Sequence, residues 1–186
     1  MASADELDLL RAEVRYLRDR ADILDCIARH ARGCDRHDAS LITSAYHPDG
    51  VDEHGNVRNT GADYAAWVNP AHAATSAVHT HNVTTHTCEI DGDTAHCDSY
   101  VIVVLLGTDG RTAQFISGRY VDRLERRDGR WRIALRRSTV EVMFTADASV
   151  LQSGFFRGQG YLKGTRDGDD LSYARPLTLE DAAERW

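Results

Sequence analysis

Four β-type runs joined by tight turns dominate the second half of the chain. The runs span residues 78–90, 95–106, 113–126 and 131–144, and each of the three junctions contains an Asp-Gly pair. Asp-Gly is a strong signal for a hairpin turn, so we expect these runs to form an antiparallel meander. The stretch from Tyr100 to Leu106 is apolar on both faces, which predicts a sheet covered on both sides, by helices or by another subunit.

The first half of the chain has helical periodicity instead. Apolar side chains recur at steps of three, four and seven, which predicts one amphipathic helix over the first thirty residues, ending near Gly33. The predicted apolar stripe consists of Leu10, Val14, Leu17, Leu24, Ile27 and Ala31. We expect a second short helix capped by Asp38, a turn at residues 47–50 and a third helix over residues 62–74. Helices followed by a meander indicate an α+β domain.

Composition limits the class of protein. The chain has 186 residues, of which 42% are hydrophobic and 27% charged, and its net charge is −7. This acidic balance disfavours nucleic-acid binding, which depends on excess Lys and Arg. The longest apolar run is strand-sized, so we expect no membrane span. The N-terminus lacks a secretion-signal pattern and the four cysteines lack metal-binding spacing, which favours a cytoplasmic protein with free thiols.

The same patterns suggest a domain boundary. Residues 1–150 contain the predicted helices and strands and are long enough to form one core. Residues 151–186 are rich in Gly, Arg and Asp. We interpret them as an irregular C-terminal tail, with a terminal helix from Thr178 to Trp186, that packs on the domain or on a neighbouring subunit.

Two histidine-containing segments place polar side chains where the periodicity expects apolar ones. His30 lies three residues after Ile27 and therefore faces the same way as the apolar stripe. Asp35 follows just past the predicted helix end. On a strand, His79 and His81 point to one face, and an inward face would bury an imidazole. Histidine carries protons near neutral pH and a neighbouring carboxylate fixes its tautomer, so these residues are candidates for acid–base chemistry.

A pair of arginines interrupts the last strand. Arg136 and Arg137 are adjacent in an otherwise apolar run, and one of them must face inward if the strand is regular. An inward arginine either offsets a carboxylate or stabilises negative charge that develops on a substrate oxygen. An outer-face ion pair is the alternative for either residue.

Four segments resemble the SnoaL-like group of the nuclear-transport-factor-2-like (NTF2-like) superfamily. They are ARHARGCDRHD, SLITSAYHPDG, HNVTTHTCEIDGDTA and SGRYVDRLERRDGRWRIALRR, within a region from about Leu9 to Phe144. The resemblance implies a cone in which a curved antiparallel sheet packs on a long N-terminal helix and two shorter helices and encloses an apolar pocket. Similar members include scytalone dehydratase, bile-acid 7α-dehydratase, the lindane dehydrochlorinase, polyketide cyclases and ketosteroid isomerases, several of which need no cofactor.

The resemblance also implies roles for individual residues. It places a catalytic aspartate at Asp35, a catalytic histidine at His81 and an arginine at Arg136. His30 occupies a position that is often Tyr or Lys in relatives, and Thr85 stands where relatives have Asn. His79 becomes the inward residue instead of His81 if the strand register shifts by two.

From these roles we predict a cofactor-independent lyase of the dehydratase type that acts on a hydrophobic polycyclic or aromatic, polyketide-like small molecule. His81 is the expected general base, oriented by Asp35, while His30 protonates the departing hydroxyl and Arg136 supports negative charge. The candidate substrate-binding residues are Tyr46, Trp67, His79, Tyr100, Phe115 and Phe144.

Other functions remain open at this stage. The same fold supports a cyclase or an isomerase, including a cycloaddition steered by cavity shape, and a non-catalytic small-molecule-binding protein. Asp35, His79 and His81 together would also form a metal site of two histidines and a carboxylate, although we expect neither a metal nor a cofactor. The sheet face not covered by helices is expected to bind another copy, giving a homodimer or a homotrimer.

Overall fold

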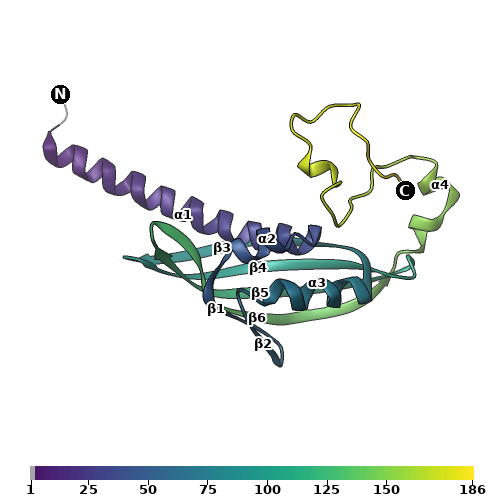
Figure 1. Ribbon diagram of the computed structural model, residues 1–186, viewed down its shortest axis with the longest axis horizontal. Coiled ribbons are helices and arrows are strands. Elements are labelled where there is room, and N and C mark those ends of the chain that lie inside the picture. Colours follow the sequence, from purple (N-terminus) through teal and green to yellow (C-terminus); the bar gives the residue numbers. More distant parts are fainter. Residues whose placement is uncertain (1–2) are drawn as a thin grey trace.

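A long helix lies across a curved six-stranded sheet in the computed structural model, which describes residues 3–186 (Figure 1). The strand order is β2-β1-β6-β5-β4-β3. The strands are β1 Tyr46–His54, β2 Val57–Thr60, β3 Ser76–Asp91, β4 Thr94–Gly107, β5 Thr112–Arg127 and β6 Arg130–Asp147. The predicted meander is confirmed as β3 to β6, with the Asp-Gly pairs at or beside its three hairpin turns.

The predicted turn at residues 47–50 is wrong, because these residues belong to β1. This strand pairs in parallel with β6 and in antiparallel fashion with β2. Gly50 permits the close approach, since a Cβ at this position would lie 2.5 Å from the carbonyl oxygen of Ile133. The mixed sheet places the inward residues of β1 next to those of β6.

Three helices cover one face of the sheet. They are α1 Ala4–Arg36, α2 Ala39–Ser44 and α3 Tyr64–Thr75. The predicted cap of α2 is confirmed, because the Asp38 side chain accepts from the Leu41 backbone N–H at 2.9 Å. Ile23 and Ile27 of α1 and Val68 of α3 share one core with the inward residues of the strands. The α+β cone is therefore the fold of this chain.

The predicted apolar stripe of the first helix is wrong over most of its length. Leu10, Val14, Leu17 and Leu24 are exposed, whereas Ile27 and Ala31 are buried. Figure 1 shows the reason, since the first half of α1 extends past the edge of the sheet and has nothing to pack against. The buried face of the second half is made of Asp19, Ile23, Cys26, Ile27, His30, Ala31, Gly33, Cys34 and Asp35.

The C-terminal tail returns to the end of α1 (Figure 1). It contains the short helix α4 Gly154–Arg157 and two 3-10 turns, Ser149–Gln152 and Leu171–Tyr173, but no helix over residues 178–186, so that prediction is wrong. Arg36 of α1 donates to Asp170 of the tail at 2.7 Å. Among the described helices, none is both long and apolar enough for a transmembrane segment.

Candidate active site

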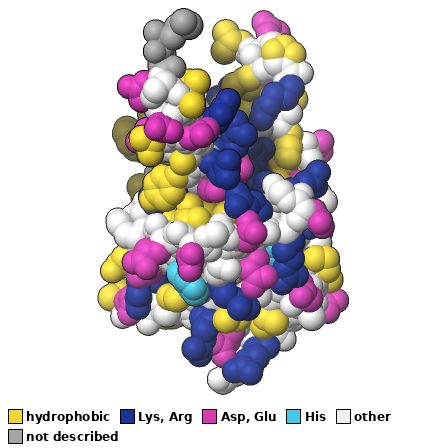
Figure 2. All heavy atoms as spheres, turned by 90° about the vertical axis from the view of Figure 1, so that its left-hand side faces the viewer, with side chains coloured by type: hydrophobic (Ala, Val, Ile, Leu, Met, Phe, Trp, Pro, Cys, Tyr) yellow, Lys and Arg dark blue, Asp and Glu magenta, His cyan; other side chains and the backbone are white. Residues whose placement is uncertain are grey.

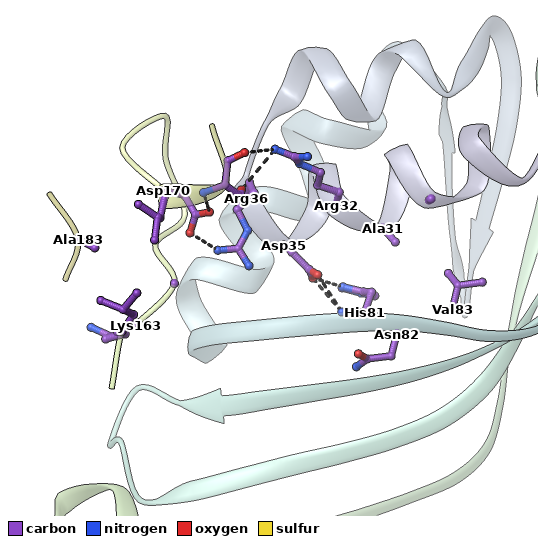
Figure 3. Close-up of a pocket in the computed structure, with 15 residues that line it drawn as sticks. Ala31, Arg32, Asp35, Arg36, His81, Asn82, Val83, Lys163, Asp170 and Ala183 are labelled. Carbon is purple, nitrogen blue, oxygen red and sulfur yellow. Dashed lines mark hydrogen bonds and ion pairs between the residues drawn. The ribbon is translucent and has the colours of Figure 1, made fainter. Parts of the chain in front are cut away.

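The Asp35 carboxylate and the His81 imidazole are in direct contact (Figure 3). His81 Nδ1 lies 2.6 Å from Asp35 Oδ1, and the His81 backbone N–H donates to both carboxylate oxygens at 3.0 Å. Asp35 stands in the last turn of α1, where the helix dipole disfavours a negative charge, and these hydrogen bonds offset that cost. The carboxylate thus joins the end of α1 to β3.

This contact fixes the proton positions on the imidazole. An ionised carboxylate only accepts hydrogen bonds, so His81 Nδ1 carries the proton that it donates to Asp35. The lone pair of the neutral ring is then on Nε2, which has no hydrogen-bond partner among residues 3–186. An imidazole held at Nδ1 by a carboxylate and unpaired at Nε2 has the arrangement of a general base.

A cavity of about 710 Å³ opens beside the pair. Its walls come from α1, β3 and the C-terminal tail, and Figure 3 shows Asp35 and His81 between α1 and β3 at this cavity. The apolar lining includes Ala28, Ala31, Val83, Leu162 and Leu171, and the cationic lining is Arg32, Arg36 and Lys163. The cavity therefore combines a hydrophobic surface with positive charges close to the base.

His79 lies beside the pair but uses both of its ring nitrogens for structural contacts. Its Nε2 is 2.9 Å from the carbonyl oxygen of Cys34, and Arg166 Nη2 donates to its Nδ1 at 2.7 Å. Since an arginine only donates, the proton of His79 is on Nε2. Burial lowers the pKa of His79 to about 3, and the neighbouring His72 acts in the same direction. His79 does not line the cavity, so the prediction that it contacts substrate there is not supported by its position.

Two groups of side chains around His79 have a composition suited to metal binding. One is His37, His72 and His79, and the other is Asp35, His79 and His81; in each, three ligand atoms lie within 4.8 Å of one another. Both groups require a lone pair on His79, whose two nitrogens are already hydrogen-bonded. The donor sets therefore do not fit a metal ion unless these hydrogen bonds break.

A second polar group occupies the interior between the helices and the sheet. Arg136 is fully buried, and its Nε and Nη2 donate to Asp122 at 2.8 and 2.6 Å. Its guanidinium carbon lies 3.8 Å from the centre of the Tyr120 ring. The Tyr46 hydroxyl donates to Asp52 at 2.7 Å. Burial raises the pKa of Asp52 to about 6, although Arg136 acts in the opposite direction.

The two adjacent arginines of β6 point to opposite faces. Arg136 faces the interior, while Arg137 is on the outer face and pairs with Glu53. Three interior atoms, Arg136 Nη1, Asp52 Oδ1 and His30 Nδ1, are buried without a hydrogen-bond partner in the described part of the chain. Buried polar atoms are normally paired, so these three are available to a polar ligand or to water.

His30 is enclosed by aromatic rings. The ring centroids of Tyr46, Tyr64 and Tyr120 lie 5.5, 5.3 and 5.6 Å from that of His30. Burial lowers the pKa of His30 well below its usual value, and Arg136 adds to the effect. His30 is thus neutral, and neither it nor Arg136 lines the cavity that reaches His81. The structure brings Asp35 and His81 together at the cavity, while His30 and Arg136 lie in the interior, where both contact Tyr120.

The predicted substrate-binding aromatics divide between the two faces of the sheet. Tyr46 is in the interior, and the half-buried Trp67 packs between Tyr64 and His54 at 5.7 and 5.8 Å. Tyr100, Phe115 and Phe144 are on the outer face, so their assignment to the pocket wall is wrong. Tyr100 and Phe144 are 48% and 50% exposed, and Phe115 stacks on Phe144 at 4.8 Å. Because this part of the sheet is apolar on both faces, hydrophobicity alone does not distinguish inward from outward residues.

Several site residues were missed by the sequence interpretation. Asp52 comes two residues after the predicted turn at residues 47–50. Arg166 lies in the irregular tail, 87 positions from its partner His79. Tyr120 and Asp122 could have been found from the period-two pattern of β5, because they share its inward face with Gly118 and Leu124. His72 of α3, whose ring centroid lies 4.3 Å from that of His79, had no such signal.

The chain belongs to the SnoaL-like domain family, whose model matches residues 15–137. Its fold is similar to that of LinA, a hexachlorocyclohexane dehydrochlorinase, with 20% identity, a TM-score of 0.68 and coverage of 72% of this chain and 93% of LinA. A putative scytalone dehydratase from Novosphingobium aromaticivorans has 18% identity, a TM-score of 0.62 and coverage of 71% and 89%. A comparison with curated proteins gives no sequence match.

The similar structures differ in what is known of them. Rv3472 from Mycobacterium tuberculosis, with 28% identity, a TM-score of 0.60 and coverage of 67% of this chain and 77% of its own, is described as a protein of unknown function. The family thus includes enzymes as well as proteins without an assigned reaction. At these identities the structural similarity defines the NTF2-like fold, and the chemistry must be argued from the side chains.

Proposed function

We propose that this chain is a cofactor-independent lyase of the dehydratase type, with His81 as general base and Asp35 as the residue that orients it. The observation that carries the proposal is the 2.6 Å contact between Asp35 Oδ1 and His81 Nδ1, which leaves Nε2 unpaired beside a cavity. His81 Nε2 removes a proton from a carbon next to a carbonyl group. Asp35 stabilises the imidazolium that forms, and it stays ionised.

A single imidazole suffices for the elimination of water. After it accepts the carbon-bound proton, the His81 imidazolium donates that proton to the hydroxyl group that departs, so a double bond and water are formed and His81 returns to its starting state. This route does not need His30, whose ring is outside the cavity. For a substrate that reaches the interior, Arg136 Nη1 supplies a further hydrogen-bond donor, and His30 Nδ1 is a second unpaired polar atom.

The proposed substrate is a hydrophobic polycyclic or aromatic small molecule with an oxygen substituent. The alanine, valine and leucine side chains of the cavity suit an apolar body, and Arg32, which forms no ion pair within the described chain, suits a carbonyl or enolate oxygen. The other two cations are paired, Arg36 with Asp170 and Lys163 with Glu184. LinA and the putative scytalone dehydratase, whose names indicate small-molecule elimination or dehydration, support this class of reaction. The free thiols of all four cysteines fit a cytoplasmic setting.

An isomerase or cyclase is the second candidate. It is favoured by the position of His30, because a proton transfer from carbon to carbon needs one base and no separate donor for a leaving group. Deuterium uptake distinguishes the two reactions. An isomerase incorporates solvent deuterium into a product of unchanged composition, whereas a lyase releases water.

The test uses a panel of hydrophobic β-hydroxy ketones and phenolic polycycles, incubated with the protein in D2O and followed by NMR and mass spectrometry. For any compound that is converted, His81→Gln is expected to lower kcat by about 10²–10⁴-fold. His96→Gln is the matched control, since His96 is exposed on β4 and distant in register from the pair. Near-normal turnover by His81→Gln would contradict the proposed mechanism, and binding without conversion by the unaltered protein would favour a non-catalytic binding protein.

A further inference from the structure

The protruding half of α1 carries an apolar seam that no other described part of the chain covers. Residues 3–18 are all exposed. The largest apolar side chains in the seam are Leu7, Leu10, Val14, Leu17 and Leu24, which are 42–63% exposed. Helices obtain most of their stability from packing of an amphipathic face, so an uncovered seam of this length indicates a missing partner. Figure 2 views this end of the molecule, where hydrophobic side chains lie exposed among acidic and basic ones.

The seam has the spacing of a coiled coil. With Leu7 at heptad position a, the following a positions are Val14 and Ala21, and the d positions are Leu10, Leu17 and Leu24. The spacing alternates between three and four residues without interruption over three heptads. An apolar stripe that faces a globular core is wider than two positions per heptad, whereas a strict a and d pattern is the narrow seam of paired helices.

The seam does not compete with the core for the same helix face. The side chains of α1 that pack on the sheet, Asp19, Ile23, Cys26 and Ile27, occupy positions f, c, f and g. At 100° per residue, positions c and f lie on the side of the helix away from a and d, and only Ile27, at position g beyond the last d residue of the seam, lies beside it. A partner helix can therefore occupy the seam while α1 stays on the sheet.

The charges beside the seam identify the partner as a second copy of this chain in parallel orientation. In a parallel pair, each g residue faces the e residue five positions later in the other helix. The three such pairs are Glu6 with Arg11, Glu13 with Arg18 and Arg20 with Asp25, and every one joins opposite charges. An antiparallel pair centred on the seam, in which g neighbours g and e neighbours e, would place Glu13 near Arg20 but would also bring Arg11 of each chain near Arg18 of the other, which are like charges.

The middle charge pair is the most informative. Glu13 and Arg18 are exposed, and neither forms an ion pair with another residue of the described chain. Glu6 also closes the N-terminal capping box with Ser3, and Arg20 also donates to the Cys88 carbonyl oxygen at 3.0 Å. Glu13 and Arg18 are therefore free to select a partner.

We propose that residues 7–24 of α1 form a parallel, two-stranded coiled coil with the same residues of a second copy. Leucine at every d position and valine at the central a position favour two strands. The interface is isologous, because each chain contributes the same surface. It is separate from the outer sheet face and independent of the proposed reaction, and it leaves the cavity beside His81 outside the contact.

The first test measures the molar mass of the full chain by light scattering and sedimentation over a dilution series. The expected mass is an even multiple of 20.7 kDa. Leu10→Ser with Leu17→Ser is expected to halve it, whereas Leu9→Ser with Tyr16→Ser, at the equally exposed c positions, leaves it unchanged. A monomeric unaltered protein, an unchanged mass in the seam variant or an equal loss in the control variant would overturn the proposal.

The second test uses charge reversal. Glu13→Arg alone and Arg18→Glu alone each place like charges across both sides of a parallel pair, so each variant is expected to dissociate at low ionic strength. An equimolar mixture of the two is expected to recover the mass, because both contacts in the mixed dimer become attractive. Failure of the mixture to associate, with both variants still helical by circular dichroism, would refute the parallel pairing.

The third test defines the orientation. Leu10→Cys places thiols opposite each other at a d position in a parallel pair, and oxidation is expected to link the two chains. In the centred antiparallel arrangement, position 10 faces position 21, and the two thiols are separated by about 16 Å along the helix. Absence of the cross-linked dimer would overturn the parallel orientation. The unaltered protein, whose four cysteines are all buried, gives the background level of cross-linking.

Discussion

Replacement of Asp35 by Asn should remove the negative charge that supports the proposed base, His81, while leaving the shape of the site intact. Asp35 Oδ1 accepts from His81 Nδ1 at 2.6 Å, and Asp35 Oδ2 accepts from the His81 backbone N–H at 3.0 Å. An asparagine offers one oxygen and one NH2 group to the same two donors. With its oxygen at the Oδ1 position, the asparagine still accepts from His81 Nδ1 and from the His81 backbone N–H, because both donors reach Oδ1.

The amide carries no negative charge, so it does not stabilise the imidazolium that forms when His81 Nε2 takes a proton. General-base catalysis of this kind contributes about 10²–10⁴-fold, so we expect kcat to fall by that factor, about 3 to 5 kcal/mol of activation free energy. KM should change little, because the cavity wall keeps its shape.

The assay compares kcat of the unaltered protein, Asp35→Asn and the exposed-histidine control His96→Gln on the same converted compound. Thermal unfolding and circular dichroism show whether Asp35→Asn keeps the fold. Chemical shifts of the imidazole nitrogens of His81 report the tautomer directly. A folded Asp35→Asn variant that retains kcat within about threefold would refute the reasoning, since it would leave less than about 1 kcal/mol to the orienting carboxylate.

Three further outcomes follow from the buried contacts. Arg136→Met leaves Asp122 buried without its cation, and we expect a loss of about 3–5 kcal/mol in the free energy of unfolding measured with urea, most of it recovered when Asp122→Leu is added. The fold lowers the pKa of His79 to about 3, so between the usual histidine pKa of about 6.5 and this value the unfolded chain binds more protons than the folded one. The free energy of unfolding should therefore fall as the pH drops through this range. In melting curves recorded at several pH values, His79→Gln should reduce this dependence on pH, whereas His96→Gln should not. Arg166→Gln loses charged hydrogen bonds to β3, and limited proteolysis should cleave the C-terminal tail faster; an unchanged cleavage rate would show that other contacts hold the tail.

Local signals in the sequence were sufficient for the meander and for the two members of the Asp35–His81 pair. Alternation and Asp-Gly turns act between neighbours in the sequence, and β3 to β6 follow from them. The position of Asp35 past a predicted helix end, and of His81 on a strand, came from pattern and family resemblance together. Their meeting depends on how α1 crosses β3, which only the packing of the whole domain determines.

Long-range contacts explain the failures. The His47-Pro48-Asp49-Gly50 segment has the composition of a turn, but it forms a strand because β6 provides a parallel partner about 85 residues away. Tyr100 and Phe144 were assigned inward because both faces of their strands are apolar. Arg166 reaches His79 from a segment without periodicity, so no pattern in the sequence could have predicted that contact.

The exceptions to ordinary burial rules gather in the interior around Arg136. A core made by hydrophobicity alone would not contain a fully buried arginine, a carboxylate with a raised pKa and an imidazole with an unpaired nitrogen. Each of these costs free energy of folding, since a buried polar group without a partner loses its hydration. Arg136, Asp52 and His30 share one interior with Tyr46 and Tyr120. Stability does not explain these costs, and such departures from ordinary burial gather at functional sites in proteins.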